Sequence, residues 1–146
     1  RMDGRWQVID EVDPDVSLEV LNVNTIGPLR VAQALWPLLE ATGQSKVANI
    51  TSLMGSIEDC QSGRSYAYRT SKTGLNMITK ILSVEGKDAD ISVSCYHPGW
   101  VLTDMGGERA PVLPQESVKG LIELIEMQTL ERSGRFFEYT GVELPW

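Results

Sequence analysis

Residues 68–72 read Tyr68-Arg69-Thr70-Ser71-Lys72, and no other short segment says as much about this chain. The first and last of these side chains are four residues apart. In a helix, a phenol and an ammonium therefore leave the same face one turn apart. A cation close to a phenol stabilises the phenolate, so a tyrosine in this setting can exchange a proton with a carbonyl oxygen near neutral pH. The pattern alone is weak, and its meaning depends on the sequence around it.

This segment lies in one of three predicted helices. Asp13-Pro14 is typical of a helix start, and an apolar pattern follows it as far as Gly43, a residue suited to a helix end. The apolar positions of this first helix are Val16, Val20, Val23, Leu29, Leu35 and Leu39. A second helix is predicted over residues 65–85 and ends at Gly86. A third is indicated by a stripe of Val118, Leu121, Ile122 and Ile125.

Three strands are predicted between and after these helices. Short apolar runs at residues 46–51, 91–96 and 135–139 have the length and composition of strands, and the first is expected to be buried. The order is helix, strand, helix, strand, helix, strand, which predicts an α/β fold with a parallel sheet and right-handed crossovers. A doubly wound dinucleotide-binding domain has about six strands and starts with a glycine-rich turn. The pair Gly106-Gly107 lies in a late loop and cannot serve as that turn.

Size and composition restrict the class of protein. The chain has 146 residues, 42% hydrophobic and 23% charged, which predicts a single globular domain. A net charge of −7 argues against nucleic acid or an anionic membrane as a partner. No apolar run approaches the ~20 residues of a membrane span. Cys60 and Cys95 lack metal-ligand spacing, and reduced thiols in the cytoplasm are favoured over a disulfide.

Ser52 is a second candidate site residue. It ends the first predicted strand, and catalytic groups of parallel sheets gather just beyond the carboxyl ends of strands. A serine hydroxyl there can donate a hydrogen bond to a carbonyl oxygen whose charge grows during a reaction. The alternative is a serine that bonds only to its own turn.

Asn24 lies inside the first predicted helix, where asparagine is unfavourable. Pro28 has no N–H, so the helical bond that would end on the Asn24 carbonyl cannot form. We expect the helix to bend there and leave this carbonyl free for a water. Such a water could join the carbonyl to Lys72 and carry protons towards Tyr68. The alternative is a simple kink with a solvated asparagine.

A glycine- and proline-rich loop follows the second predicted strand. It begins His97-Pro98-Gly99-Trp100, and Thr103 comes four residues after Gly99. A Pro-Gly turn lets a ring approach the backbone closely. His97 is the only histidine, and without a partner cluster it predicts neither a metal site nor a Ser-His-Asp hydrolase. We interpret it as structural.

Four features in one order resemble the short-chain dehydrogenase/reductase family. They are Asn24 before Gly27, Ser52-x-x-Gly55, Tyr68-x-x-x-Lys72, and Pro98-Gly99 with Thr103. The resemblance runs from about residue 15 to the end. Within the family, the stretches 66–77, 97–107 and 133–146 look like the branch that contains C-factor and sniffer-like carbonyl reductases. The interval from Ser52 to Tyr68 is a few residues longer than in the commonest members.

The resemblance implies a role for each matching residue. Tyr68 would be the general acid in reduction and the general base in oxidation, and Lys72 would favour its phenolate and hold the nicotinamide ribose. Ser52 would polarise the substrate carbonyl, and Asn24 would anchor a relay water. At the nicotinamide end, the cofactor contacts would be Pro98, Gly99 and Thr103. Tyr66 does not fit the spacing to Lys72 and receives no role. The implied function is NAD- or NADP-dependent interconversion of a carbonyl and an alcohol on a small molecule.

The resemblance also implies a division of the domain. Residues 1–146 would form the C-terminal, catalytic half of a Rossmann domain, with the nucleotide-binding half lying before Arg1. The two long helices are candidates for the four-helix dimer face common in the family. An alternative function is non-catalytic intercellular signalling of the C-factor kind. With the partner of its first strand missing, the 146-residue chain is expected to dimerise, to aggregate or to need the other half.

Overall fold

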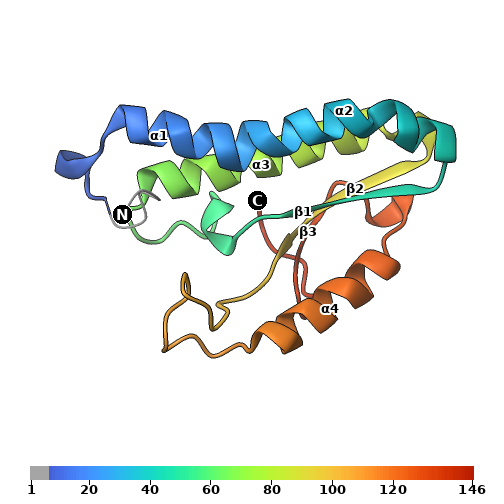
Figure 1. The fold of residues 1–146 in the computed structure, drawn as a ribbon. Coiled ribbons are helices and arrows are strands. Elements are labelled where there is room, and N and C mark those ends of the chain that lie inside the picture. The colour runs from blue at the N-terminus through green and yellow to red at the C-terminus, as the bar shows by residue number, and fades with distance from the viewer. Residues whose placement is uncertain (1–6) are drawn as a thin grey trace.

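The computed structural model describes residues 7–146 and confirms the alternation of helices and strands (Figure 1). The helices are α1 (Pro14–Leu21), α2 (Gly27–Thr42), α3 (Tyr66–Glu85) and α4 (Pro114–Glu126), and the strands are β1 (Ser45–Ile50), β2 (Ile91–His97) and β3 (Phe136–Glu138). A π-helical turn, η2 (Asn22–Ile26), joins α1 to α2, and the 3-10 turns are η1 (Ile9–Glu11), η3 (Leu53–Gly55), η4 (Lys87–Ala89) and η5 (Leu130–Arg132).

The sheet has the order β1-β2-β3, and both pairings are parallel. Strand β2 lies in the middle and is buried along almost its whole length. Strand β1 is an edge in the part of the chain that the structure describes, and Ile50 is 44% exposed. The expectation of a buried first strand is therefore wrong for these residues, because only one side of β1 is paired and part of its surface is left uncovered.

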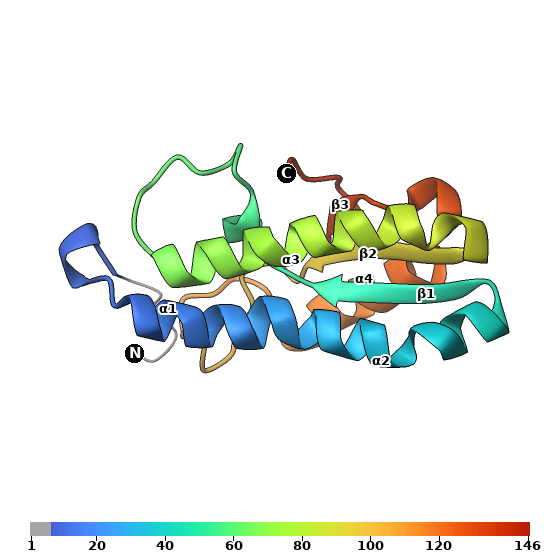
Figure 2. The ribbon, with the colours of Figure 1, turned by 90° about the horizontal axis from the view of Figure 1, so that it is seen from above.

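Helices cover both faces of the sheet. In Figure 1, α1, α2 and α3 lie on one side and α4 on the other, and Figure 2 shows α2 and α3 side by side along the sheet. Beneath the α2–α3 layer, Ala32 and Leu82 pack against Ile91 and Val93. On the opposite face, the core consists of Tyr96, Leu124 and Phe137. Because the strands are parallel, the loops that follow β1 and β2 leave the same edge of the sheet.

The first predicted helix forms, with one irregularity where proline was expected to disturb it. Asp13 caps α1 by accepting from the N–H groups of Asp15 and Val16, and α2 ends at Gly43, where φ is +64°. Instead of bending, the helix widens into η2, in which the Gly27 N–H donates to the Asn22 carbonyl. Figures 1 and 2 show α1, η2 and α2 following one continuous course. A turn with i→i+5 bonding accommodates the missing N–H without a kink.

This π-turn explains why part of the predicted apolar face is exposed. An extra residue in the turn shifts the phase of every later side chain relative to α1. Val20 is buried as expected, whereas Val23 is 69% exposed and Leu35 is 45% exposed. The inward positions are instead taken by Thr25 and Ala32.

Helix α4 also differs from its predicted stripe. Leu124 is the buried apolar residue of this helix, and Leu121 and Ile125 pack partly beside it. Val118 and Ile122 are both about half exposed. They point away from the sheet because α4 contacts it only along the side that carries Leu121, Leu124 and Ile125. Among residues 7–146, no helix combines the length and apolar character that crossing a bilayer requires.

Candidate active site

Tyr68 and Lys72 lie in the first half of α3, and their side chains meet as the spacing predicts. The Lys72 Nζ atom is 5.8 Å from the centre of the Tyr68 ring. Nζ also donates a hydrogen bond of 3.1 Å to the carbonyl oxygen of Ile50, the last residue of β1. The ammonium is therefore held between the end of a strand and the phenol. Burial lowers the pKa of Lys72 from its usual value.

Ser52 lies just beyond β1 and begins the turn η3. Its hydroxyl oxygen accepts a hydrogen bond from the Met54 N–H at 3.2 Å, and its side chain is almost fully buried. This is the bond within its own turn that the alternative interpretation of Ser52 predicts. It uses the oxygen as an acceptor and leaves the hydroxyl proton available for donation to another group. The turn therefore orients Ser52 without consuming its donor.

The turn after Ser52 packs directly on the backbone of Lys72. A Cβ atom placed on Gly55 would lie 2.8 Å from the Lys72 carbonyl carbon, closer than such atoms approach in folded proteins. The Gly55 carbonyl accepts hydrogen bonds from Thr73 Oγ1 at 2.9 Å and Asn76 Nδ2 at 3.2 Å. Gly55 thus lets the Ser52 turn and the Tyr68–Lys72 helix come together.

Asn24 lies in the π-turn and reaches the same helix through a serine. Its Nδ2 donates to Ser71 Oγ at 3.1 Å, and Ser71 Oγ donates to the Tyr68 carbonyl at 2.8 Å. Next to it, Thr25 Oγ1 donates to the Ser71 carbonyl at 2.7 Å. The side chain of Asn24 is therefore bonded to α3, in contrast to the solvated asparagine of the alternative.

Pro98, Gly99 and Thr103 follow β2 at the same edge of the sheet. The Pro98 carbonyl accepts from Ser117 Oγ at 2.6 Å. Gly99 has φ +82°, and a Cβ there would lie 2.8 Å from the Tyr139 ring. The sequence predicted that a ring could approach this glycine closely, and in the structure the side chain of Tyr139 does so. Thr103 is exposed, and its hydroxyl bonds within its own loop, to Val101 and Gly106.

The carboxyl ends of β1 and β2 are hydrogen-bonded to each other. Ser52, which follows β1, and Pro98, which follows β2, therefore start from the same edge of the sheet. The Thr51 N–H donates to the Tyr96 carbonyl at 2.8 Å, so the strands stay paired up to their last residues. Ser52 and His97 therefore leave neighbouring strands at the same level. The ring atom His97 Nδ1 is buried and has no hydrogen-bond partner among the described residues.

Sequence reasoning did not single out three polar residues that hold this region together. Thr51 Oγ1 donates to Asn76 Oδ1 at 2.7 Å, and both residues are buried. Ser71 links Asn24 to Tyr68, as described above. The position of Ser71, three residues after Tyr68 on one helix face, was the available signal for it. Thr51 and Asn76 are 25 residues apart, and nothing local in the sequence pairs them.

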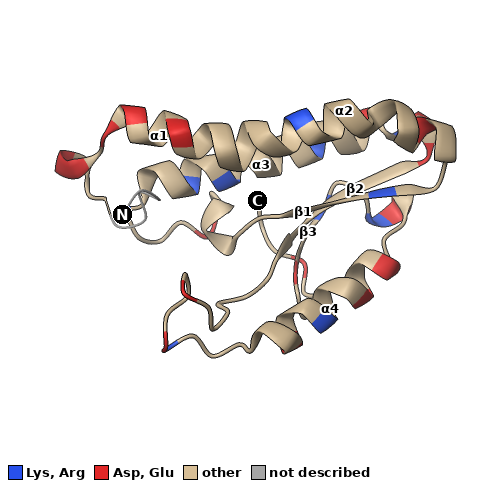
Figure 3. Cartoon of the chain, viewed as in Figure 1, with Lys and Arg blue, Asp and Glu red and all other residues tan. Residues whose placement is uncertain are grey.

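The charges around the site differ from those of the chain as a whole. Against a net charge of −7, Arg69 and Lys72 place two cations in the first half of α3. Figure 3 shows acidic residues on η1, α1 and α4 and in the loop after β2, and others, such as Glu58 and Asp59, follow η3. Within residues 7–146, no cluster of His, Cys, Asp or Glu is arranged to hold a metal ion.

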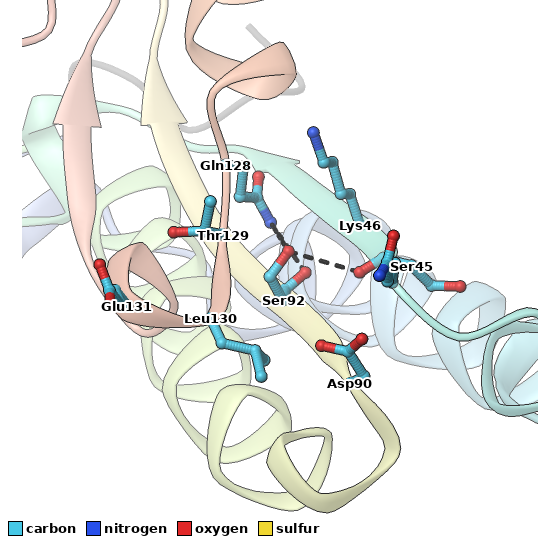
Figure 4. Close-up of a pocket in the computed structure, with 9 residues that line it drawn as sticks. Ser45, Lys46, Asp90, Ser92, Gln128, Thr129, Leu130 and Glu131 are labelled. Atoms are coloured by element: carbon cyan, nitrogen blue, oxygen red, sulfur yellow. Dashed lines mark hydrogen bonds between the residues drawn. The ribbon is translucent and has the colours of Figure 1, made fainter.

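A cavity of about 480 Å³ lies elsewhere, at the amino ends of the strands (Figure 4). Gln128 is buried there, and its Nε2 donates to the Ser92 carbonyl at 2.7 Å. Lys46, at the rim, donates to the last carbonyls of α4. None of the candidate site residues lines this cavity. The side chains of Ser45, Ser92 and Gln128 that line it already bond within the protein, which is typical of a structural crevice.

Comparison with known proteins shows which family the sequence resembles. The model of the family described as short chain dehydrogenase matches residues 4–112. The chain is 40% identical to C-signal of Myxococcus xanthus over 143 residues, covering 98% of this chain and 86% of that protein. It is 38% identical to 1-hydroxy-2-glutathionyl-2-methyl-3-butene dehydrogenase of a Rhodococcus species, covering 94% of this chain and 63% of that one.

Solved structures resemble the chain closely in fold. The carbonyl reductase Sniffer of D. melanogaster superposes with a TM-score of 0.92 at 35% identity, over 97% of this chain and 62% of that one. An NADPH-bound carbonyl reductase from chicken fatty liver gives a TM-score of 0.90 at 35% identity, over 98% of this chain and 62% of that one. The chain thus spans about three fifths of the length of these reductases and has the fold of that part of a Rossmann domain.

Proposed function

The chain belongs to the short-chain dehydrogenase family, and on this premise we propose that it is an NAD(P)-dependent oxidoreductase that interconverts a carbonyl and an alcohol. The observation that supports this most directly is the position of the Lys72 ammonium between the Tyr68 ring and the end of β1. The similarity to carbonyl reductases, one of them NADPH-bound, supports the same reaction and cofactor.

The residues present suit the nicotinamide end of such a cofactor. An ammonium has three N–H donors, and the bond to Ile50 uses one, so Lys72 retains donors for ribose hydroxyls. Pro98, Gly99 and Thr103 would line the nicotinamide end from the neighbouring strand. In this proposal residues 1–146 supply the catalytic part of the domain, and residues outside this range bind the adenosine half. The bound cofactor would supply the hydride.

Each catalytic residue then has a defined task. In the direction of reduction, the Tyr68 phenol gives its proton to the carbonyl oxygen, and in oxidation the phenolate takes that proton back. The nearby charge of Lys72 stabilises the phenolate between these steps. Ser52 donates a hydrogen bond from its hydroxyl to the same oxygen and stabilises the charge that develops there. Asn24 would hold a water that returns a proton towards Tyr68.

Replacing Tyr68 by phenylalanine tests this assignment in the full-length protein. Tyr68→Phe removes the proton donor but keeps the ring, so we expect kcat to fall about 10²–10⁴-fold, the usual contribution of a general acid. The KM for the cofactor should stay unchanged. Tyr66→Phe is the matched control, because Tyr66 is an exposed tyrosine on the first turn of the same helix. Wild-type turnover by Tyr68→Phe would refute the role of Tyr68.

A second candidate function is a non-catalytic signalling or interaction protein, which the 40% identity to C-signal supports. The two functions differ in their need for a cofactor. Titration of NADH and NADPH into the 146-residue chain separates them, since micromolar binding would count against a purely non-catalytic role.

We also propose a homodimer and a cytoplasmic setting. Apolar side chains are exposed on the outer sides of two long helices, at Val31, Leu35 and Leu38 of α2 and at Met77, Ile81 and Val84 of α3. A second copy would cover such a surface. Both cysteines are free thiols, one exposed and one buried, as is usual in a reducing compartment. The substrate would be a small molecule, and the acidic net charge argues against nucleic acid.

A further inference from the structure

The chain that follows β3 turns back along that strand and is fixed to it. The reversal is at Gly141, where φ is +91°. Beyond it, Leu144 donates its N–H to the Phe136 carbonyl at 2.8 Å, and Glu143 forms an antiparallel bridge with Phe137. Residues 143–146 therefore extend from a short hairpin on the sheet.

Trp146 joins this hairpin to the loop that follows Ser52. Its carbonyl oxygen accepts hydrogen bonds from the N–H groups of Ile57 and Glu58, both at 3.0 Å, and from Ser56 Oγ at 3.1 Å. Its indole ring stacks on Phe136, with ring centres 5.8 Å apart. In Figure 2 the C-terminal end lies beside the loop that leads from η3 to α3, as these bonds require.

The bonded loop is continuous with the turn that orients the Ser52 hydroxyl. Within the turn, the Gly55 N–H donates to the Ser52 carbonyl at 2.8 Å, and the Ser56 N–H donates to the Leu53 carbonyl at 2.9 Å. Helix α3 holds the turn from one side through the Gly55 carbonyl. Trp146 holds the next three residues from the other side. Ile57 and Glu58 are themselves exposed, and their carbonyls accept hydrogen bonds from within the loop, from the Cys60 N–H and from Gln61 Nε2.

We propose that Trp146 is a positioning residue for Ser52. Three donors converge on one main-chain oxygen, and the ring beside it is anchored on a fully buried phenylalanine. This arrangement fixes the exit of the Ser52 turn relative to the sheet. The direction of the Ser52 hydroxyl, set by its bond to the Met54 N–H, then depends on a residue 94 positions away in the sequence. The inference rests on the proposed function for its catalytic meaning.

Amide hydrogen exchange and turnover, measured together on the full-length protein, test this inference. Deleting Trp146 removes the accepting oxygen and the ring. We expect the Ile57 and Glu58 amides to exchange about tenfold faster, and the Met54 amide to accelerate with them. Turnover should fall about tenfold in kcat, while the KM for the cofactor stays unchanged, because Ser52 acts on the substrate oxygen.

Three further variants make the test independent of whether the deletion folds. Ser56→Ala removes one of the three donors, together with the acceptor of the Asp59 N–H, and leaves the tail intact, so it should accelerate the same amides more weakly. Trp146→Phe keeps an aromatic ring on Phe136 and should restore exchange and kcat close to wild type. Glu143→Gln is the control, because it breaks only the exposed ion pair with Arg135, 3.2 Å long, on the same tail.

The outcomes separate this inference from the proposed function. Unchanged exchange at Met54, in the deletion and in Ser56→Ala alike, would overturn the positioning role, whatever happens to Ile57 and Glu58. Faster exchange at Met54 with unchanged kcat would also overturn it. If the wild-type protein turned over no carbonyl substrate, the proposed function would fail, and exchange at Met54 would still decide whether Trp146 holds the turn.

Discussion

His97 has a buried polar atom. It ends β2, beside the Ser52 turn and directly before Pro98. Its Nδ1 atom is buried without a partner among the described residues. Burial lowers the pKa of His97 below its usual 6.5, and this effect outweighs the opposing influence of the nearby Glu138 carboxylate. The folded protein therefore binds a proton at this site less readily than the unfolded chain does.

We predict that His97 makes the protein less stable below about pH 6.5. The unfolded state takes up the proton first as the pH falls, so the free energy of unfolding decreases through this range and levels off above it. The slope from one group cannot exceed about 1.4 kcal/mol per pH unit. His97 is the only histidine, so His97→Gln should remove most of the slope between about pH 7.5 and 5.5 in urea unfolding curves. Parallel pH profiles for the two proteins would contradict the prediction.

At the scale of elements, the contact between η3 and α3 leaves no space between the Ser52 turn and the backbone of α3. Gly55 faces the backbone of Lys72 with no room for a side chain, and backbone atoms cannot move aside cheaply. The π-turn meets the same helix at a second such place, where a Cβ on Gly74 would lie 2.8 Å from Thr25 Cγ2. The Ser52 turn and the π-turn thus both meet α3 through glycines, close to Lys72.

We predict that Gly55→Ala lowers the free energy of unfolding by about 1–3 kcal/mol, the usual cost of overpacking. Because the clash falls between the Ser52 turn and Lys72, kcat should fall as well. Gly63→Ala is the control: its Cβ would meet no atom within 4 Å, so stability should change by less than about 0.5 kcal/mol. Urea unfolding and turnover of both variants check this. Equal stability of the two would show that α3 does not rest on the turn as described.

The elements that sequence reasoning predicted well are those with local signals. Pro14 after an N-cap, Gly43 and Gly86 at helix ends, and the four-residue spacing of Tyr68 and Lys72 each act within one turn of helix. Each end of the three strands was predicted to within one residue. The candidate residues that follow β1 and β2 could be grouped because parallel strands end at one edge of the sheet.

Other features depend on contacts between distant residues, which no local pattern contains. The π-turn shifted the buried face of α2 by an amount that Pro28 alone does not determine. The exposure of Val118 and Ile122 follows from which side of α4 meets the sheet. The bonds of Trp146 to the loop after Ser52 join residues about 90 positions apart, so only the folded structure shows them.

At the scale of the whole molecule, two surfaces formed by residues 7–146 are left uncovered by other described residues. One is the apolar outer side of α2 and α3, which includes Ile81, 48% exposed. The other is the free side of β1. Ser45 and Thr51 donate their N–H groups to the β2 side, to the carbonyls of Asp90 and Tyr96. The alternation of a parallel ladder therefore turns the N–H of Ala48 away from β2. Unpaired strand edges recruit other chains.

We predict that the 146-residue chain by itself associates into dimers or larger species, detectable by sedimentation velocity at micromolar concentration. Ile81→Glu places a charge on the helix face, and Ala48→Pro removes the outward N–H without breaking a bond to β2. Each variant should reduce the sedimenting mass, and together they should leave a monomer. Val142→Glu is the control, since Val142 is 57% exposed in the turn after β3 and on neither surface. A stable, folded monomer of the unmodified chain would reject the prediction, because both surfaces would then be tolerated in water.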